Sequence, residues 1–209
     1  MSEPFRIAVL ASGGGTNLQA ILDTLHGREG IEVAGVASDK PEAMALRRAE
    51  SAGVPTAVFA GGDHPDRAAR DLAMARWLEE LDIELVVLAG YMQLLTPGFL
   101  ERFPNRIINV HPALLPAFPG LDAVAQALAY GVRITGVTVH FVDEGVDTGP
   151  IILQRPVPVP PARTWDATEE VIHATEHALL PEAIRLIAAG RVSFDPVNPR
   201  VVLISPEGA

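Results

Sequence analysis

Short apolar runs alternate with segments of helical periodicity through the first 111 residues of the chain. Such runs are typical of parallel strands buried on both faces, and the segments between them have the spacing and the terminal proline or glycine of helices. This alternation predicts an α/β fold with a doubly wound, mostly parallel, Rossmann-like sheet, right-handed crossovers and helices on both faces. We expect strands at 6–12, 32–39, 56–60, 84–90 and 106–111, and helices at 17–27, 41–53 and 65–81.

The pattern changes from about residue 134. In residues 134–143 apolar and polar side chains alternate, as in a strand with one face exposed to solvent, and residues 149–159 are expected to form a second strand. This pattern predicts an antiparallel or mixed C-terminal part. A long helix follows at about 165–189, and Pro181 is expected to kink or break it. We expect a single domain, 1–209, made of an N-terminal half, 1–105, a second half, 106–195, and a tail, 196–209, that adds an edge strand or stays loose.

Composition narrows the class of protein. The 209 residues are 48% hydrophobic, which is enough for one globular domain with a large core. The net charge of −10 argues against a nucleic-acid partner, because phosphate backbones require a basic face. The chain has no cysteine, so disulfides, thiolate nucleophiles and cysteine metal sites are excluded. Without a basic leader or an 18-residue apolar stretch, we expect a cytoplasmic protein with no membrane contact.

The turn SGGGTN, residues 12–17, joins the first strand to the first helix. Backbone N–H groups at a helix N-terminus bind anions, and glycines let a ligand approach the backbone. The turn lacks the third glycine of a dinucleotide fingerprint and the Gly-Lys pair of a P-loop. A single phosphate on the amides of Gly15, Thr16 and Asn17 fits it better; the alternative is a tight turn capped by Thr16 or Asn17.

Asn109 and His111 lie at the end of the strand 106–111. Alternation places both on one side of the strand, at the carboxyl end where open α/β sheets bind ligands. An amide N–H and an imidazole can stabilise an oxyanion or donate a proton. The alternative is a hydrogen-bonded core histidine beside a turn asparagine.

Asp147 lies in an acidic, glycine-containing loop between the two later strands. An ordinary hairpin loop is the alternative interpretation. If Asp147 faces His111, its carboxylate fixes the orientation of the imidazole and raises the histidine pKa.

Other candidates are less specific. The apolar segment 89–100 could line a pocket for a flat aromatic ligand or pack in the core. Glu176 could hold a substrate amine or be solvated. His140 is expected to have a hydrogen-bonded structural role, and support of the neighbouring site residues is the lesser alternative. His173 and His177 have the i, i+4 spacing of a zinc site, but they lack the H-E-x-x-H carboxylate, so no metal is expected.

Taken in order, several of these motifs resemble one family over residues 6–190. They are SGGGTNLQAIL, LVVLAGYMQLL, INVHPALLPAFPGLDA, VHFVDEGVDTGPII and TEHALLP. Together they resemble the folate-dependent formyltransferases, and the SGGGTN loop and short chain point to the phosphoribosylglycinamide formyltransferase branch. Methionyl-tRNA formyltransferases and formyl-folate hydrolases look similar but carry an additional domain, for which we expect no room here.

The resemblance implies transfer of the formyl group of 10-formyltetrahydrofolate to the amine of glycinamide ribonucleotide, in de novo purine biosynthesis. It implies a co-substrate folate, no metal, small-molecule partners only, and a monomer or homodimer. The residues that match the family's catalytic trio are Asn109, His111 and Asp147. Those that match its substrate site are Gly15, Thr16, Asn17 and Glu176, and those that match its folate site are Arg67, Met92, Gln93, Leu94, Leu95 and Asn109.

The chain departs from the family pattern at Gln93, Ala113 and Asp122, where the family often has a basic residue, a serine and a histidine. None of these changes removes the trio. Two alternatives stay open at this point. One is another formyl-folate enzyme, such as a hydrolase or a sugar-nucleotide formyltransferase, and the other is a non-catalytic folate- or nucleotide-binding protein.

Overall fold

The computed structural model describes residues 3–162 and 164–206. The chain divides into two compact units, Met1–Ile108 and Asn109–Ala209. The prediction of a single domain whose halves meet between residues 105 and 106 stays a prediction. Each unit is built from the strands and helices of its own stretch of sequence.

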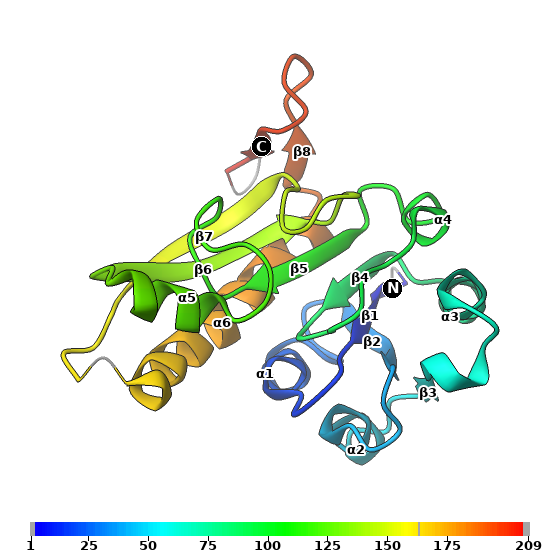
Figure 1. Cartoon of the computed structure of the whole chain (residues 1–209). Helices are drawn as coiled ribbons and strands as arrows, with labels where there is room; N and C mark the ends of the chain where they lie inside the picture. Colours follow the sequence, from blue (N-terminus) through cyan, green and yellow to red (C-terminus); the bar gives the residue numbers. More distant parts are fainter. Residues whose placement is uncertain (1–2, 163, 207–209) are drawn as a thin grey trace. The chain divides into compact units, whose positions relative to one another are not determined.

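The first unit contains parallel strands in the order β3-β2-β1-β4 (Figure 1). Side chains on both faces of β1 and β4 are buried, as the continuous apolar runs predicted. The parallel, crossover-connected strands of this unit confirm the predicted α/β class. The strands are β1 (Phe5–Leu10), β2 (Ile31–Ser38), β3 (Thr56–Val58) and β4 (Leu85–Leu88).

The helices of this unit bury one apolar side each. In α1, for example, Leu18 and Ile21 are fully buried. The start of α3 is fixed by Asp66, whose carboxylate accepts a 2.8 Å bond from the N–H of Ala69. The helical elements are α1 (Thr16–Thr24), α2 (Met44–Ser51), the 3-10 turn η1 (Gly61–Asp63), α3 (Arg67–Glu80) and the short α4 (Pro97–Leu100).

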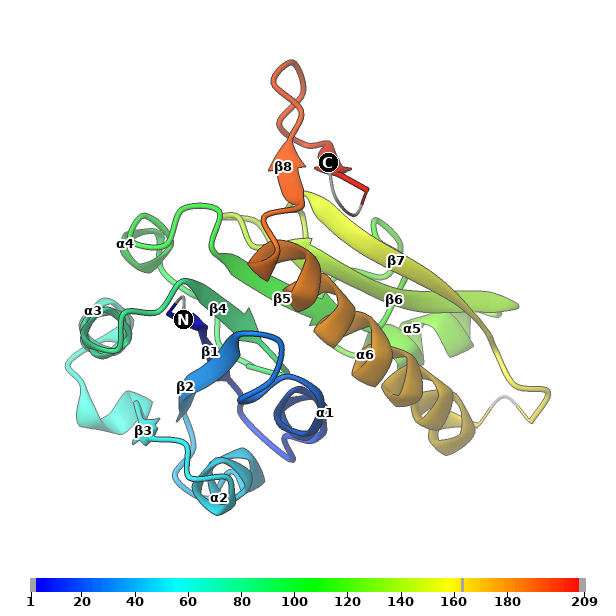
Figure 2. The same ribbon diagram turned by 180° about the vertical axis from the view of Figure 1, so that it is seen from behind.

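Strand β5 (Ile107–His111) crosses the boundary, and the second unit continues with α5 (Ala123–Tyr130), β6 (Ile134–Phe141) and β7 (Ile151–Pro158). The order is β5-β6-β7, and β6 and β7 are antiparallel, as predicted. Helix α6 (Trp165–Ala188) packs on β6 and β7 (Figure 2).

Pro181 lies inside α6 and is buried, yet α6 continues through it as one helix. The alternative of a broken helix is therefore wrong. The packed face around Pro181, which includes the fully buried Leu180 and Ile184, offsets the backbone hydrogen bond that proline cannot donate. No helix among the described residues is long and apolar enough to cross a membrane.

The chain then forms an antiparallel hairpin of β8 (Val192–Phe194) and β9 (Val202–Ile204). The tail therefore supplies one strand of this hairpin, and Val201 makes a parallel bridge to Ile151 at the start of β7. Residues 207–209 of the predicted tail lie outside the described residues.

Candidate active site

Strand β5 presents Asn109 and His111 on the same side, as the alternation predicted. Asn109 is half-buried and His111 is buried. Nε2 of His111 lies 2.8 Å from the carbonyl oxygen of Phe118, and Nδ1 lies 3.3 Å from Oδ2 of Asp147. Both nitrogens of the His111 ring therefore face an acceptor, which fixes the plane of the ring.

Asp147 comes from the loop between β6 and β7 and turns its carboxylate toward β5. Its Oδ2 accepts a 2.7 Å bond from the N–H of Gly120, and its Oδ1 lies 3.4 Å from the Nδ2 of Asn109. The backbone of Asp147 has a φ of 53°, in the left-handed region that L side chains rarely adopt. The loop therefore holds the carboxylate of Asp147 beside the imidazole of His111 in a backbone conformation that is intrinsically unfavourable for a residue other than glycine.

His140, on β6, is a fourth member of this cluster. Its Nδ1 lies 2.8 Å from the carbonyl oxygen of Phe141, which places the ring proton on Nδ1. Nε2 then accepts from the Nδ2 of Asn109 at 3.3 Å, and it lies 3.5 Å from Oδ1 of Asp147. The expected hydrogen-bonded role is present, and the contact with the amide of Asn109 adds the support of the site that was the lesser alternative for His140. The alternation of β6 does not reveal this contact, because it depends on how β6 lies beside Asn109.

The segment between β5 and α5 supplies the backbone groups of Phe118 and Gly120. The hydroxyl of Thr138, on β6, anchors this segment by donating to the carbonyl of Ala113 at 2.7 Å and accepting from the N–H of Leu115 at 3.1 Å. Thr138 is fully buried. These bonds make the positions of Phe118 and Gly120 depend on the same strand that carries His140.

Burial and charge act in opposite directions on the two titratable groups. Burial lowers the pKa of His111 below 6.5, although the Asp147 carboxylate and the Phe118 carbonyl each raise it in part. For Asp147, burial raises the pKa, but the adjacent rings of His140 and His111 and the hydrogen bond from the Gly120 N–H outweigh burial, so the pKa lies below 3.8. The expected upward effect of Asp147 on His111 is present and is outweighed by burial.

This arrangement suits the stabilisation of a negative charge on a small carbonyl group. It combines an amide donor, an imidazole and an ionised carboxylate on one side of β5, with the carboxylate oriented toward the imidazole. Oxyanion stabilisation by preorganised donors, aided by an oriented acid–base group, is what acyl and formyl transfer require.

The sequence model of the family described as formyl transferase matches residues 5–184. The chain belongs to the formyl transferase family. It is 46% identical over 192 residues to a phosphoribosylglycinamide formyltransferase of Mycobacterium tuberculosis. The aligned region covers 92% of this chain and 89% of that protein. It is 41% identical over 181 residues to the Bacillus subtilis protein of the same name, covering 86% of this chain and 93% of that one.

A solved structure shows the same fold. The crystal structure of glycinamide ribonucleotide transformylase 1 from Symbiobacterium toebii superposes with a TM-score of 0.93 at 49% identity, covering 99% of this chain and 96% of that chain. Its similarity supports the predicted α/β formyltransferase architecture and the family.

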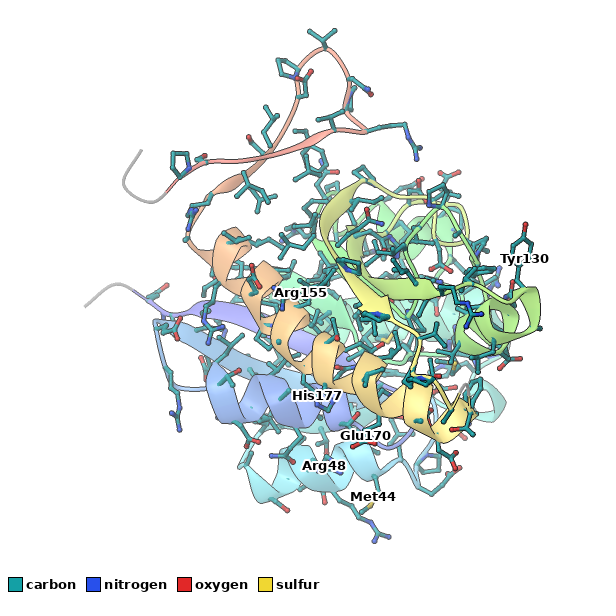
Figure 3. The ribbon with its side chains drawn as sticks, turned by 90° about the vertical axis from the view of Figure 1, so that its left-hand side faces the viewer. Met44, Arg48, Tyr130, Arg155, Glu170 and His177 are labelled. Carbon is teal, nitrogen blue, oxygen red and sulfur yellow. The ribbon has the colours of Figure 1, made fainter. Side chains whose placement is uncertain are left out.

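The glycine-rich turn lies in the first unit, where α2 shapes it. The N–H of Ala45 donates to the carbonyl of Gly13 at 3.1 Å, and Nε of Arg48, labelled in Figure 3, donates to the carbonyl of Gly14 at 2.8 Å. Gly15 has a φ of 68°, and a Cβ there would meet Ala45. Gly15 is the N-cap residue of α1, so neither Thr16 nor Asn17 occupies the N-cap position.

Five of the residues that match the family's folate site lie in the first unit, and the sixth, Asn109, lies in the second unit. Met92 and Leu94 expose more than half of their side chains. The N–H of Met92 donates to the hydroxyl of Ser12 at 2.8 Å. Gln93 is engaged on both sides: its Nε2 donates to Asp39 at 2.9 Å, and its Oε1 accepts from Arg70 at 3.1 Å. The remaining two, Leu95 and Arg67, are half-buried and exposed respectively.

Glu176 is buried on α6, so the solvated alternative is wrong. The rings of His173 and His177 stack, with centroids 6.1 Å apart and planes 13° apart. Burial and the neighbouring His173 lower the pKa of His177. Within the part of the chain that the structure describes, no three acidic or histidine side chains are grouped to hold a metal ion.

Proposed function

We propose that this chain transfers the formyl group of 10-formyltetrahydrofolate to the amine of glycinamide ribonucleotide, giving formylglycinamide ribonucleotide and tetrahydrofolate in purine synthesis. The observation that carries the proposal is the cluster of Asn109, His111 and Asp147 in a chain of the formyl transferase family. The names of its relatives support the choice of acceptor.

In the proposed reaction, the substrate amine attacks the formyl carbon and forms a tetrahedral oxyanion. Nδ2 of Asn109 and Nε2–H of His111 donate to this oxygen, the latter in place of its bond to the Phe118 carbonyl. As negative charge develops, His111 can take up the proton that the amine releases, with Nδ1–H facing the Asp147 carboxylate, and it gives that proton up again as N10 is protonated. A preorganised oxyanion donor of this kind is worth roughly 3–4 kcal/mol.

The step is then completed by breaking the bond between the formyl carbon and N10 of the folate. The amine nitrogen loses one proton and N10 gains one, so the reaction is balanced without a further reactant. Asp147 stays ionised because its pKa is low, and it accepts a hydrogen bond from the amine proton as that proton passes, through water, to N10. Holding the two substrates close together in the reactive orientation supplies much of the rate enhancement.

We assign the substrate phosphate to the amides of Gly15, Thr16 and Asn17. The start of α1 at Gly15 and the hydrogen bond from Arg48 of α2 to the glycine turn support this assignment, since helix N-termini attract anions. A dephosphorylated glycinamide riboside should therefore bind much more weakly than the ribonucleotide. Equal affinity for the riboside and the ribonucleotide would show that this loop does not bind the substrate phosphate.

We assign the glycinamide end of the substrate to Glu176, whose buried carboxylate suits an amine. The folate ring is assigned to the segment from Met92 to Leu95, where exposed apolar side chains are available, with Arg67 and Asn109 as further contacts. The side chain of Gln93 already bonds Asp39 and Arg70, so we assign its contribution to the backbone.

Folate release tests the proposal. The purified protein is mixed with 10-formyltetrahydrofolate, with and without glycinamide ribonucleotide, and tetrahydrofolate formation is followed by absorbance. We expect release only when the ribonucleotide is present. Release without it would indicate a hydrolase, and no release in either case would indicate a different acceptor or a non-catalytic binding protein.

A further inference from the structure

The β8–β9 hairpin contacts both flanks and the middle of the loop that carries Asp147. Before the loop, the ring of Phe194 packs on that of Phe141 with centroids 4.9 Å apart. After the loop, Val201 forms a parallel bridge with Ile151. In the middle, Nη2 of Arg200 donates to the carbonyl oxygen of Thr148, the residue next to Asp147, at 2.8 Å.

We propose that the β8–β9 hairpin is a clamp that positions the Asp147 carboxylate, and that Arg200 is its principal positioning residue. Arg200 acts through the backbone of Thr148 and does not itself touch substrate. This inference rests on the proposed function only in that formyl transfer is the activity used to measure the effect of Arg200. The hairpin also lies beyond residues 5–184, the segment that the family model matches.

The loop needs an external restraint because its conformation is unfavourable in isolation. Asp147 has a left-handed φ of 53°. Gly149 packs so closely beneath the carbonyl of Phe141 that a Cβ there would clash with it. Within the loop, Asp143 accepts from Thr148 Oγ1 at 2.6 Å and from the N–H of Gly145 at 3.1 Å, so one of these bonds holds the side chain of Thr148. The bond from Arg200 holds the carbonyl of Thr148, in the peptide between Thr148 and Gly149.

The hairpin is itself organised to present Arg200. The carboxylate of Asp195 accepts from the N–H groups of Val197 and Asn198 at 2.8 and 2.9 Å, and these bonds lower the pKa of Asp195. Oδ1 of Asn198 then accepts from the N–H of Arg200 at 3.2 Å. The turn between β8 and β9 is thus closed by its own bonds, and the hairpin stands beside the start of β7 in Figure 1.

The test compares Arg200→Ala with Arg200→Lys and with Arg155→Ala as the matched control. Arg155, labelled in Figure 3, lies on β7 of the same unit and pairs with Glu182 of α6 at 2.8 Å, both half-exposed. Its replacement makes the same charge change on the same unit. Lysine at position 200 keeps a cationic donor that can reach the Thr148 carbonyl.

We expect Arg200→Ala to lower kcat by on the order of tenfold to a hundredfold, because small displacements of a catalytic group cost this much. The KM for glycinamide ribonucleotide should change little, Arg200→Lys should recover most of the loss, and Arg155→Ala should match the wild type. A kcat for Arg200→Ala like that of the wild type, or an equal loss in Arg155→Ala, would overturn the inference. So would a loss explained by KM alone.

Hydrogen–deuterium exchange gives a readout that does not depend on turnover. The backbone amides of residues 143–149 should exchange faster in Arg200→Ala than in the wild type, and at the wild-type rate in Arg155→Ala. Unaltered exchange in Arg200→Ala would contradict the clamp. A wild type that releases folate without the ribonucleotide would overturn the proposed function alone, since the effect of Arg200 would then be measured on hydrolysis.

Discussion

His111 and Asp147 face each other across the strand end of the second unit, with Nδ1 and Oδ2 3.3 Å apart. The low pKa of Asp147 keeps its carboxylate ionised, and burial keeps the His111 imidazole neutral. The two can become an ion pair if His111 takes up a proton when an oxyanion forms beside it. This relationship gives both residues a testable role.

Removing either partner should abolish most of the turnover and leave the fold in place. We expect His111→Ala and Asp147→Asn each to lower kcat by at least about a hundredfold, the scale of a positioned acid–base group. Asp147→Asn keeps an oxygen that can accept the hydrogen bond from the Gly120 N–H, so the variant tests the effect of the negative charge alone. Steady-state kinetics, with thermal unfolding as the control for folding, measures the effect. Near-normal turnover in either variant would exclude that residue from the mechanism.

The buried imidazole should also make stability depend on pH. The pKa of His111 is lower in the folded chain than its unfolded value of 6.5, so the unfolded chain binds more protons between the two values. Acidification from pH 7.5 to pH values below 6.5 should therefore reduce the free energy of unfolding. In His111→Gln this pH-dependent loss should be smaller, as measured by urea unfolding at two pH values. An identical pH dependence in both proteins would mean that His111 is not the group responsible.

The glycine turn offers a matched pair of substitutions. Gly15 has a φ of 68°, and a Cβ there would approach the Cα of Ala45 to 2.7 Å, whereas a Cβ at Gly14 meets nothing within 4 Å. We expect Gly15→Ala to lose about 1–3 kcal/mol of stability and to weaken binding of glycinamide ribonucleotide. Gly14→Ala should cost much less. Denaturant unfolding and calorimetric titration measure both quantities, and equal effects of the two variants would contradict this account of the loop.

Much of the fold could be predicted because local patterns determined it. The buried runs of β1 and β4 and the helical spacing between strands are consequences of burial on both faces, and the structure shows them as expected. The α5 helix was not predicted, and α6 runs through Pro181 without the break considered as an alternative. In α6, packing in the second unit outweighs a local preference, which no local pattern can reveal.

The site was predictable only in part, for a related reason. Alternation places Asn109 and His111 on one side of a strand, because the period of two is local. The contact of His111 with Asp147 depends on a left-handed backbone at an aspartate, and the part played by His140 depends on how it lies beside Asn109. Both follow from tertiary structure, so sequence alone left them as alternatives.

The most direct test of the central claim follows the formyl carbon itself. The protein is incubated with glycinamide ribonucleotide and 10-formyltetrahydrofolate carrying an isotopic label in the formyl group, and the labelled product is separated. This account predicts that the label appears on the ribonucleotide as an N-formyl group, and that Asp147→Asn slows its appearance on the order of a hundredfold. Label recovered as free formate, whether or not the ribonucleotide is present, would contradict it.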